Sequence, residues 1–165
     1  MCAVMVLMIL LWCPPVFAKY CTVKSEGSSR SCIYKVDRIP NNSQIIISYT
    51  KQGWSMLIVV FLDEFAIIEG PATVKTKKGE KQTIEHLTTQ RDMTPGGRMM
   101  EAAIYKVSEE LLRELGNAKG KVRFWLKGKQ IKKDKEVEVA ASLFSDLGEY
   151  IDETKTELSV LFQDQ

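Results

Sequence analysis

The chain of 165 residues carries 23 basic and 21 acidic side chains, a net charge of +2 at pH 7, and 45% apolar residues. This length suits one domain with a hydrophobic core and is too short for a multidomain enzyme. The composition excludes collagen, coiled coils, disordered proteins and polytopic membrane proteins. The near-neutral balance argues against nucleic acid as a partner.

Residues 1–18 differ in composition from the rest of the chain, because they hold no charged side chain and 16 of the 18 are apolar. Two prolines end the apolar run, and Val16 and Ala18 are the small, uncharged residues that precede a signal-peptidase cut. We therefore expect a signal peptide at 1–18, cleaved before Lys19, and a single secreted or periplasmic domain at 19–165. A retained anchor is the alternative, but the run is shorter than the ~20 apolar residues of a membrane span. We thus expect no transmembrane span in the mature chain.

Cleavage would remove two of the four cysteines and leave Cys21 and Cys32, in a compartment where disulfides form. If Glu26-Gly27 is a two-residue hairpin turn, residues whose numbers sum to 53 face each other, and Cys21 lies opposite Cys32. Such a pair has the short Cβ–Cβ distance that a disulfide needs. We expect this disulfide, with two buried free thiols as the alternative. We expect no metal site, because two cysteines and the single histidine, His86, are too few for a closed zinc site.

From Tyr20 to Thr88, short β-prone runs alternate with turn residues every 8–12 positions, which is typical of an antiparallel meander. The expected strands are residues 20–24, 30–36, 44–50, 54–62, 65–68, 72–76 and 82–88. Asp63 and Glu64 interrupt the most β-prone run, 54–68, and make a membrane span costly. We therefore expect this run to be a buried central hairpin.

Beyond Asp92 the apolar period becomes helical, and Glu101 would lie on the polar side of the helix. The apolar stripe consists of Met100, Ala103, Ile104, Val107, Leu111 and Leu115. Strands are expected at 121–127 and 135–139, and a second amphipathic helix at 142–154. The predicted fold class is α+β: an antiparallel β-meander sheet packed with one long amphipathic helix, residues 98–115, and one shorter one.

Charge segregation is the most informative surface feature of the sequence. Residues 119–135 hold eight basic side chains and one acidic one, whereas residues 146–164 hold six acids and one base, so two local fields cancel in the net charge. The candidate binding residues are Lys121, Arg123, Trp125, Lys127, Lys129, Lys132 and Lys133, and a second hairpin with Lys75, Lys77, Lys78 and Lys81 would extend the patch. The alternative is a solvated edge hairpin whose lysines prevent sheet-to-sheet association.

No recognisable catalytic constellation accompanies this patch. A triad of His86, a serine and Asp63 or Asp92 would lack the Gly-x-Ser-x-Gly elbow. We expect an exported, non-catalytic binding or accessory protein without a cofactor, whose basic hairpin contacts an unknown protein or an anionic envelope component: a lipid, a glycan or an acidic protein. Two alternatives stay open, a small secreted hydrolase centred on His86 and a structural subunit of a cell-envelope assembly.

The order of the expected elements resembles that of small periplasmic proteins of Gram-negative bacteria, such as the invasion-associated locus B family. The second cysteine pair of that family is absent here. The resemblance therefore implies only the compartment, and no functional residue is carried over from it.

Overall fold

A computed structural model of the chain describes residues 20–23, 30–37, 39–50, 52–76, 80–130 and 134–163. The side chains of residues 21–23, 30–31 and 158–163 are not described. The expected signal peptide, residues 1–18, lies outside the described residues.

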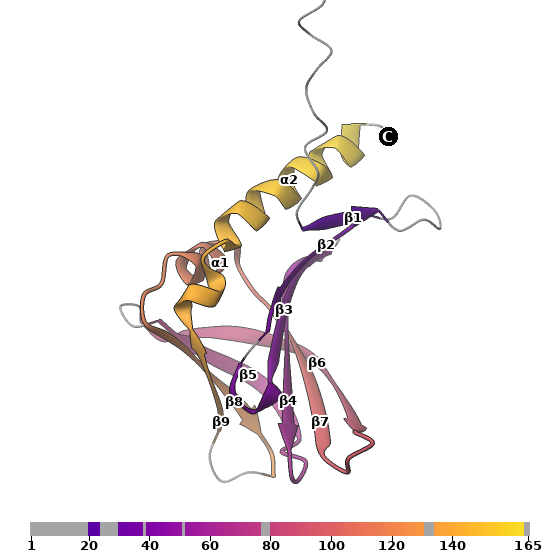
Figure 1. The fold of residues 1–165 in the computed structure, drawn as a ribbon, viewed down its shortest axis with the longest axis vertical. Helices are drawn as coiled ribbons and strands as arrows, with labels where there is room; N and C mark the ends of the chain where they lie inside the picture. The colour runs from indigo at the N-terminus through magenta and orange to yellow at the C-terminus, as the bar shows by residue number, and fades with distance from the viewer. Residues whose placement is uncertain are drawn as a thin grey trace, which may run out of the picture.

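The described residues form one antiparallel sheet, in which neighbouring strands follow the order β1-β2-β3-β4-β7-β6-β5-β8-β9. The sheet curls into a half-barrel (Figure 1). The strands are β1 (Cys21–Val23), β2 (Arg30–Val36), β3 (Gln44–Thr50), β4 (Gly53–Leu62), β5 (Ile68–Lys75), β6 (Gln82–Met93), β7 (Met99–Lys106), β8 (Lys121–Gly128) and β9 (Lys135–Ala140).

Two α-helices, α1 (Glu109–Gly116) and α2 (Leu147–Gln163), lie at one end of the half-barrel, as Figure 1 shows for the described residues. Ser108 caps α1, because its side chain accepts a hydrogen bond from the Leu111 N–H. Two short 3-10 helices, η1 (Pro40–Asn42) and η2 (Ala141–Phe144), join strands and helices. Apolar side chains of the inner sheet face and of the helices form the core, including Ile47, Met56, Ile58, Phe124, Leu112, Phe144 and Tyr150.

Strand β8 shows how the alternation predicted for it separates core from surface. Val122, Phe124 and Leu126 are fully buried, whereas Lys121 and Arg123 are exposed. Successive side chains of a strand point to opposite faces, so one face of β8 closes the core and the other carries the basic residues.

The predicted α+β fold is wrong, because the protein is mostly antiparallel β, and in the described part of the chain the long sheet-packing helix expected at 98–115 is not formed. Of the helix expected at 98–115, Met99–Lys106 is instead strand β7, which pairs with β4 on one side and β6 on the other, and only residues 109–115 are helical, as part of α1. Ala102 and Ala103 point to opposite faces of β7, and both are buried. Because both faces of β7 are covered, apolar residues occur at odd and even positions, and this pattern matched helical spacing by coincidence. The shorter helix expected at 142–154 is divided into η2 and the 17-residue α2.

The predicted central hairpin at 54–68 is only half correct. Strand β4 lies inside the sheet, but its neighbours are β3 and β7. Residues 65–67 leave the sheet as a connection, and the strand that follows, β5, pairs with β6 and β8 instead. The expected strands 65–68 and 72–76 therefore contribute to one strand, β5, which has an irregularity between Ile68 and Ala72.

The predicted register of the first hairpin is confirmed by the backbone. Strand β1 pairs with β2 so that Cys21 faces Cys32 and Val23 faces Arg30. The predicted turn and the Cys21 side chain lie outside the described residues, so the disulfide stays a prediction.

The prediction on membrane spans is tested only for the described part of the chain. No helix there is both long and apolar enough to cross a membrane.

Candidate functional site

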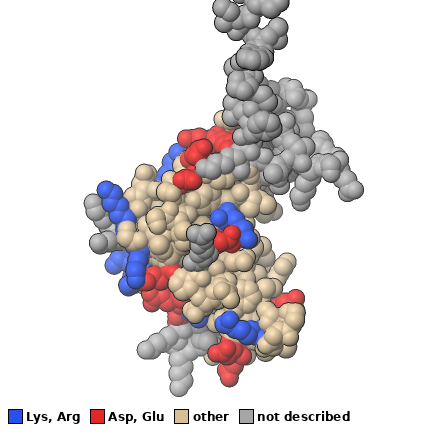
Figure 2. All heavy atoms as spheres, in the orientation of Figure 1, with Lys and Arg blue, Asp and Glu red and all other residues tan. Residues whose placement is uncertain are grey.

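Five of the predicted basic-patch residues lie around one surface cavity of about 670 Å³. The cavity lies beside β5 and β8, at the edge of the half-barrel near β9. Figure 2 shows basic side chains gathered along the left edge of the molecule, with acidic side chains directly below them. The lining residues are Lys75, Thr76, Lys81, Gly120, Lys121, Arg123 and Trp125.

Strand pairing explains why two hairpins contribute to one cavity. Lys75 at the end of β5 faces Arg123 of β8, and Thr73 faces Trp125. Lys81 directly precedes β6, the other neighbour of β5, and its ammonium lies 5.2 Å from the centre of the Trp125 ring. This geometry is typical of a cation–π contact. The suggested extension of the patch to Lys75 and Lys81 is therefore present in the structure.

The acidic residues of β9 neutralise one side of the cavity. Glu138 forms ion pairs with Lys121 and, at 3.0 Å, with Arg123, and Glu136 lies 3.4 Å from Arg123. The hydrogen bond from Lys121, with a further one from Arg123, lowers the pKa of Glu138 below its ordinary value. Lys121 and Arg123 thus already have carboxylate partners before any ligand arrives.

The other side of the cavity is not neutralised in this way. Among the described residues, no carboxylate lies within ion-pair distance of Lys75 or Lys81. Trp125, which follows Arg123 on the same face of β8, is partly exposed. The cavity therefore combines two ammonium groups without acidic partners among the described residues, two cations that are paired, and one partly exposed indole.

The remaining predicted binding residues lie outside the cavity lining. Lys127 is exposed on the same strand, and its side chain passes close to Gly70. Lys129 forms an ion pair with Glu69. Lys132 and Lys133, like Lys77 and Lys78, lie outside the described residues.

His86, the residue on which the hydrolase alternative depends, has a different set of contacts. Its Nε2 lies 2.7 Å from the hydroxyl oxygen of Thr89, and that hydroxyl donates a hydrogen bond to the carbonyl of Ile68 at 2.7 Å. The imidazole edge also packs against the ring of Tyr105. Because the Thr89 hydroxyl donates to a backbone carbonyl, it is not placed to give its proton to His86. This arrangement gives the hydrolase alternative no support.

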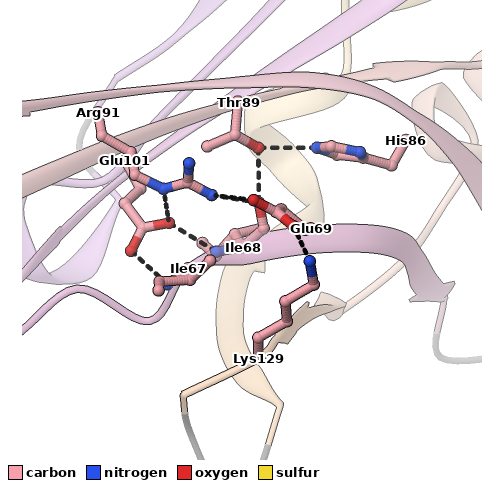
Figure 3. Close-up of polar contacts among 8 residues, drawn as sticks. All are labelled: Ile67, Ile68, Glu69, His86, Thr89, Arg91, Glu101 and Lys129. Atoms are coloured by element: carbon pink, nitrogen blue, oxygen red, sulfur yellow. Dashed lines mark hydrogen bonds and ion pairs between the residues drawn. The ribbon is translucent and has the colours of Figure 1, made fainter.

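A buried carboxylate, which the sequence analysis placed on the polar side of a helix, holds the start of β5. Glu101 is fully buried and accepts hydrogen bonds from the N–H groups of Ile67 at 2.9 Å and Ile68 at 2.7 Å (Figure 3). Arg91 lies 3.6 Å from the same carboxylate. Ile67 has φ +52°, a conformation that is strained for a β-branched residue. The two hydrogen bonds hold this strained turn in place.

The same network continues to the surface (Figure 3). Arg91 pairs with Glu69 at 3.1 Å, and Glu69 also pairs with Lys129 beyond the end of β8. Hydrogen bonds from Lys129 and Arg91 lower the pKa of Glu69. Lys129 therefore joins β8 to β5, and this contact explains why it belongs to a structural network and not to the cavity. The only sign of this network in the sequence was Glu101, a glutamate within an apolar run, and such a glutamate has no distinctive spacing.

Metal ligation was tested on the described residues alone. They contain no group of three or more His, Cys, Asp or Glu side chains that could hold a metal ion.

Comparison with known protein families, curated proteins and solved structures finds no match to this chain.

Proposed function

We propose that this protein is an exported, non-catalytic binding protein that holds an anionic ligand in the cavity formed by Lys75, Lys81, Arg123 and Trp125. The observation that carries the proposal is the pair of ammonium groups, Lys75 and Lys81, that open to one cavity with a partly exposed indole and without a described carboxylate partner. An anion placed there gains two charge-assisted hydrogen bonds and reduces the repulsion between the lysines.

The shape of the site supports binding over a purely solvated edge. Lysines that only prevent sheet association need no cavity and no aromatic neighbour. Here the aliphatic parts of lysine side chains and the Trp125 ring line a hollow of about 670 Å³, which is within the range of small-molecule sites. Strand β8 is paired with β5 on one side and β9 on the other, so its lysines do not lie on the edge strand of the sheet.

The structural-subunit alternative loses one of the two features that motivated it, the apolar region at 54–68, whereas the side chains of the other, the apolar tail at 158–162, are not described. The apolar run from Trp54 to Leu62 is β4, inside the sheet, and Met56, Ile58 and Val60 are fully buried in the core of this chain. These side chains therefore have no free surface to offer to an assembly.

Export is the part of the proposal that depends on sequence. The uncharged apolar residues 1–18, with Val16 and Ala18 before the expected cut, support it. Amino-terminal sequencing of the protein recovered from the periplasm or medium should begin at Lys19. Recovery of the uncut chain from the cytoplasm alone would contradict export.

Binding is tested with a panel of anionic probes, each paired with a neutral counterpart. The pairs are phosphatidylglycerol and phosphatidylcholine vesicles, heparin and dextran, poly-glutamate and poly-glutamine peptides, and 2-naphthoate and 2-naphthamide. At low salt, at least one anionic probe should bind more tightly than its counterpart, and added salt should weaken this binding.

The variant that tests the site is Lys75→Gln/Lys81→Gln, with Lys127→Gln as the matched control, because Lys127 is an exposed lysine on the same sheet outside the cavity. The double variant should lose about tenfold in affinity or more, and the control should bind like the wild type. Absence of binding to every anionic probe, or equal binding by the double variant, would overturn the proposal.

A further inference from the structure

We infer that the ligand is a small aromatic acid, which carries one anionic group on a planar apolar body, and not an extended polyanion. This inference rests on the proposed function and specifies the ligand of the same cavity. The anionic group would lie between the ammonium groups of Lys75 and Lys81, and the planar body would contact Trp125.

The first argument is the charge that remains for a ligand. Four cations line the cavity, but Lys121 and Arg123 are paired with Glu136 and Glu138. The site therefore offers a ligand two ammonium groups that no described carboxylate pairs with, and a single carboxylate with two oxygens suffices to contact both.

The second argument is the border of the cavity. Glu138 lies across from Arg123, and Glu136 lies across from Trp125, along the neighbouring strand β9. A polyanion that extended across the strands would pass directly from the cavity to these two carboxylates. Repulsion there opposes a glycan chain or an anionic membrane, whereas a ligand confined to the cavity avoids it.

The third argument is the aromatic surface. Trp125 is partly exposed, in contrast to Trp54, which is 7% exposed within the core. Lys81 already lies over the indole. A planar apolar ring gains contact with the indole and with the flat guanidinium of Arg123, whereas a sugar or a free inorganic anion gains much less.

The experiment is calorimetric titration of the purified protein with 2-naphthoate, 2-naphthamide, acetate, heparin and phosphatidylglycerol vesicles. We expect 2-naphthoate to bind, and 2-naphthamide and acetate to bind at least about tenfold more weakly, because each lacks one of the two recognised parts. We expect no measurable binding of heparin or of the vesicles.

Two variants assign the two parts of the ligand. Lys75→Gln/Lys81→Gln should remove the preference for 2-naphthoate over 2-naphthamide. Trp125→Leu should lower the affinity for 2-naphthoate and for 2-naphthamide alike, by about three- to tenfold. Lys127→Gln is the control and should match the wild type. Unchanged thermal midpoints show that each variant is folded.

The outcomes separate this inference from the proposed function. If heparin or vesicles bind through Lys75 and Lys81 while 2-naphthoate does not, the ligand is a polyanion, and the inference fails while the proposed function stands. If 2-naphthoate binds equally well to the Lys75→Gln/Lys81→Gln variant, or if no anion binds, both fail.

Discussion

Strand β5 meets charged side chains at each of its ends, and the two groups differ in how completely they are paired. At its start, Glu101 and Glu69 form ion pairs with Arg91, and Glu69 also pairs with Lys129. At its end, Lys75 opens to the cavity, where the described residues offer it no carboxylate. The same strand therefore begins in a closed ionic network and ends at an open cationic site.

Burial explains the difference between the two ends. Glu101 is fully buried, and a buried charge without partners is strongly destabilising, so its hydrogen bonds have to be complete. Lys75 is exposed and stays hydrated, so leaving it unpaired costs little. Paired charges at the start hold the chain in place, whereas at the end no described carboxylate pairs with Lys75, which is the feature on which the proposed ligand site depends.

The largest expected effect is at the closed end. Glu101→Ala should lower the free energy of unfolding by about 3 kcal/mol, because it leaves two buried N–H groups and Arg91 without their acceptor. Urea denaturation measures this loss. Glu64→Ala, at an exposed turn position, is the control and should stay within about 0.5 kcal/mol of the wild type. A Glu101→Ala protein as stable as this control would show that the network does not hold the start of β5.

The second prediction converts paired cations at the open end into unpaired ones. Glu136→Gln/Glu138→Gln removes the partners of Lys121 and Arg123 and should raise the affinity for 2-naphthoate by about three- to tenfold. Titration at low salt measures the change, and heparin should also begin to bind. An unchanged affinity for both probes would mean that the β9 carboxylates do not limit the site.

A third prediction uses pH at the exposed part of the closed network. The pKa of Glu69 is lowered in the folded protein, so its ion pairs stabilise the fold above its ordinary pKa, and this contribution disappears as the pH falls through the folded pKa. Glu69→Gln should therefore lower the thermal midpoint at neutral pH, and the difference from the wild type should shrink in acid. A difference that grows in acid would contradict this assignment. Affinity for 2-naphthoate should not change.

The smallest effect is expected at a buried polar group that, unlike Glu101, has no hydrogen-bond partner among the described residues. Tyr105 is fully buried on the same strand as Glu101, and its hydroxyl finds no hydrogen-bond partner among the described residues. Burial raises the pKa of Tyr105, so the hydroxyl stays neutral. Tyr105→Phe should leave the free energy of unfolding unchanged or raise it by up to about 0.5 kcal/mol. A loss of more than about 1 kcal/mol in urea denaturation would reveal a hydrogen bond there.

Much of the sheet could be predicted from the sequence, and the exceptions have a common physical cause. Strands β2 and β3 have the predicted bounds, because short β-prone runs end at clear turn residues. Strand β7 was mistaken for a helix, because it is covered on both sides and its apolar residues show no two-residue period. The sequence therefore placed Glu101 on a solvent-facing side of a helix, although it is the one acidic or basic side chain that is buried among the described residues.

The candidate site was predicted in composition but not in arrangement. Local alternation correctly placed Arg123 and Trp125 on the polar face of β8. It could not show that Lys129 pairs with Glu69, nor that Glu138 neutralises Lys121, because those partners come from other strands.

The sequence by itself determined the features that depend on neighbouring residues: the composition of residues 1–18, the Cys21–Cys32 register, and the two faces of β8. Only the tertiary structure decided which cations remain unpaired. The strand order places Arg123 between Lys75 on β5 and Glu138 on β9. Ion pairing depends on such distances in space and not on separation along the chain. For this reason the net charge of +2 concealed both a closed network and an open cationic cavity at the two ends of one strand.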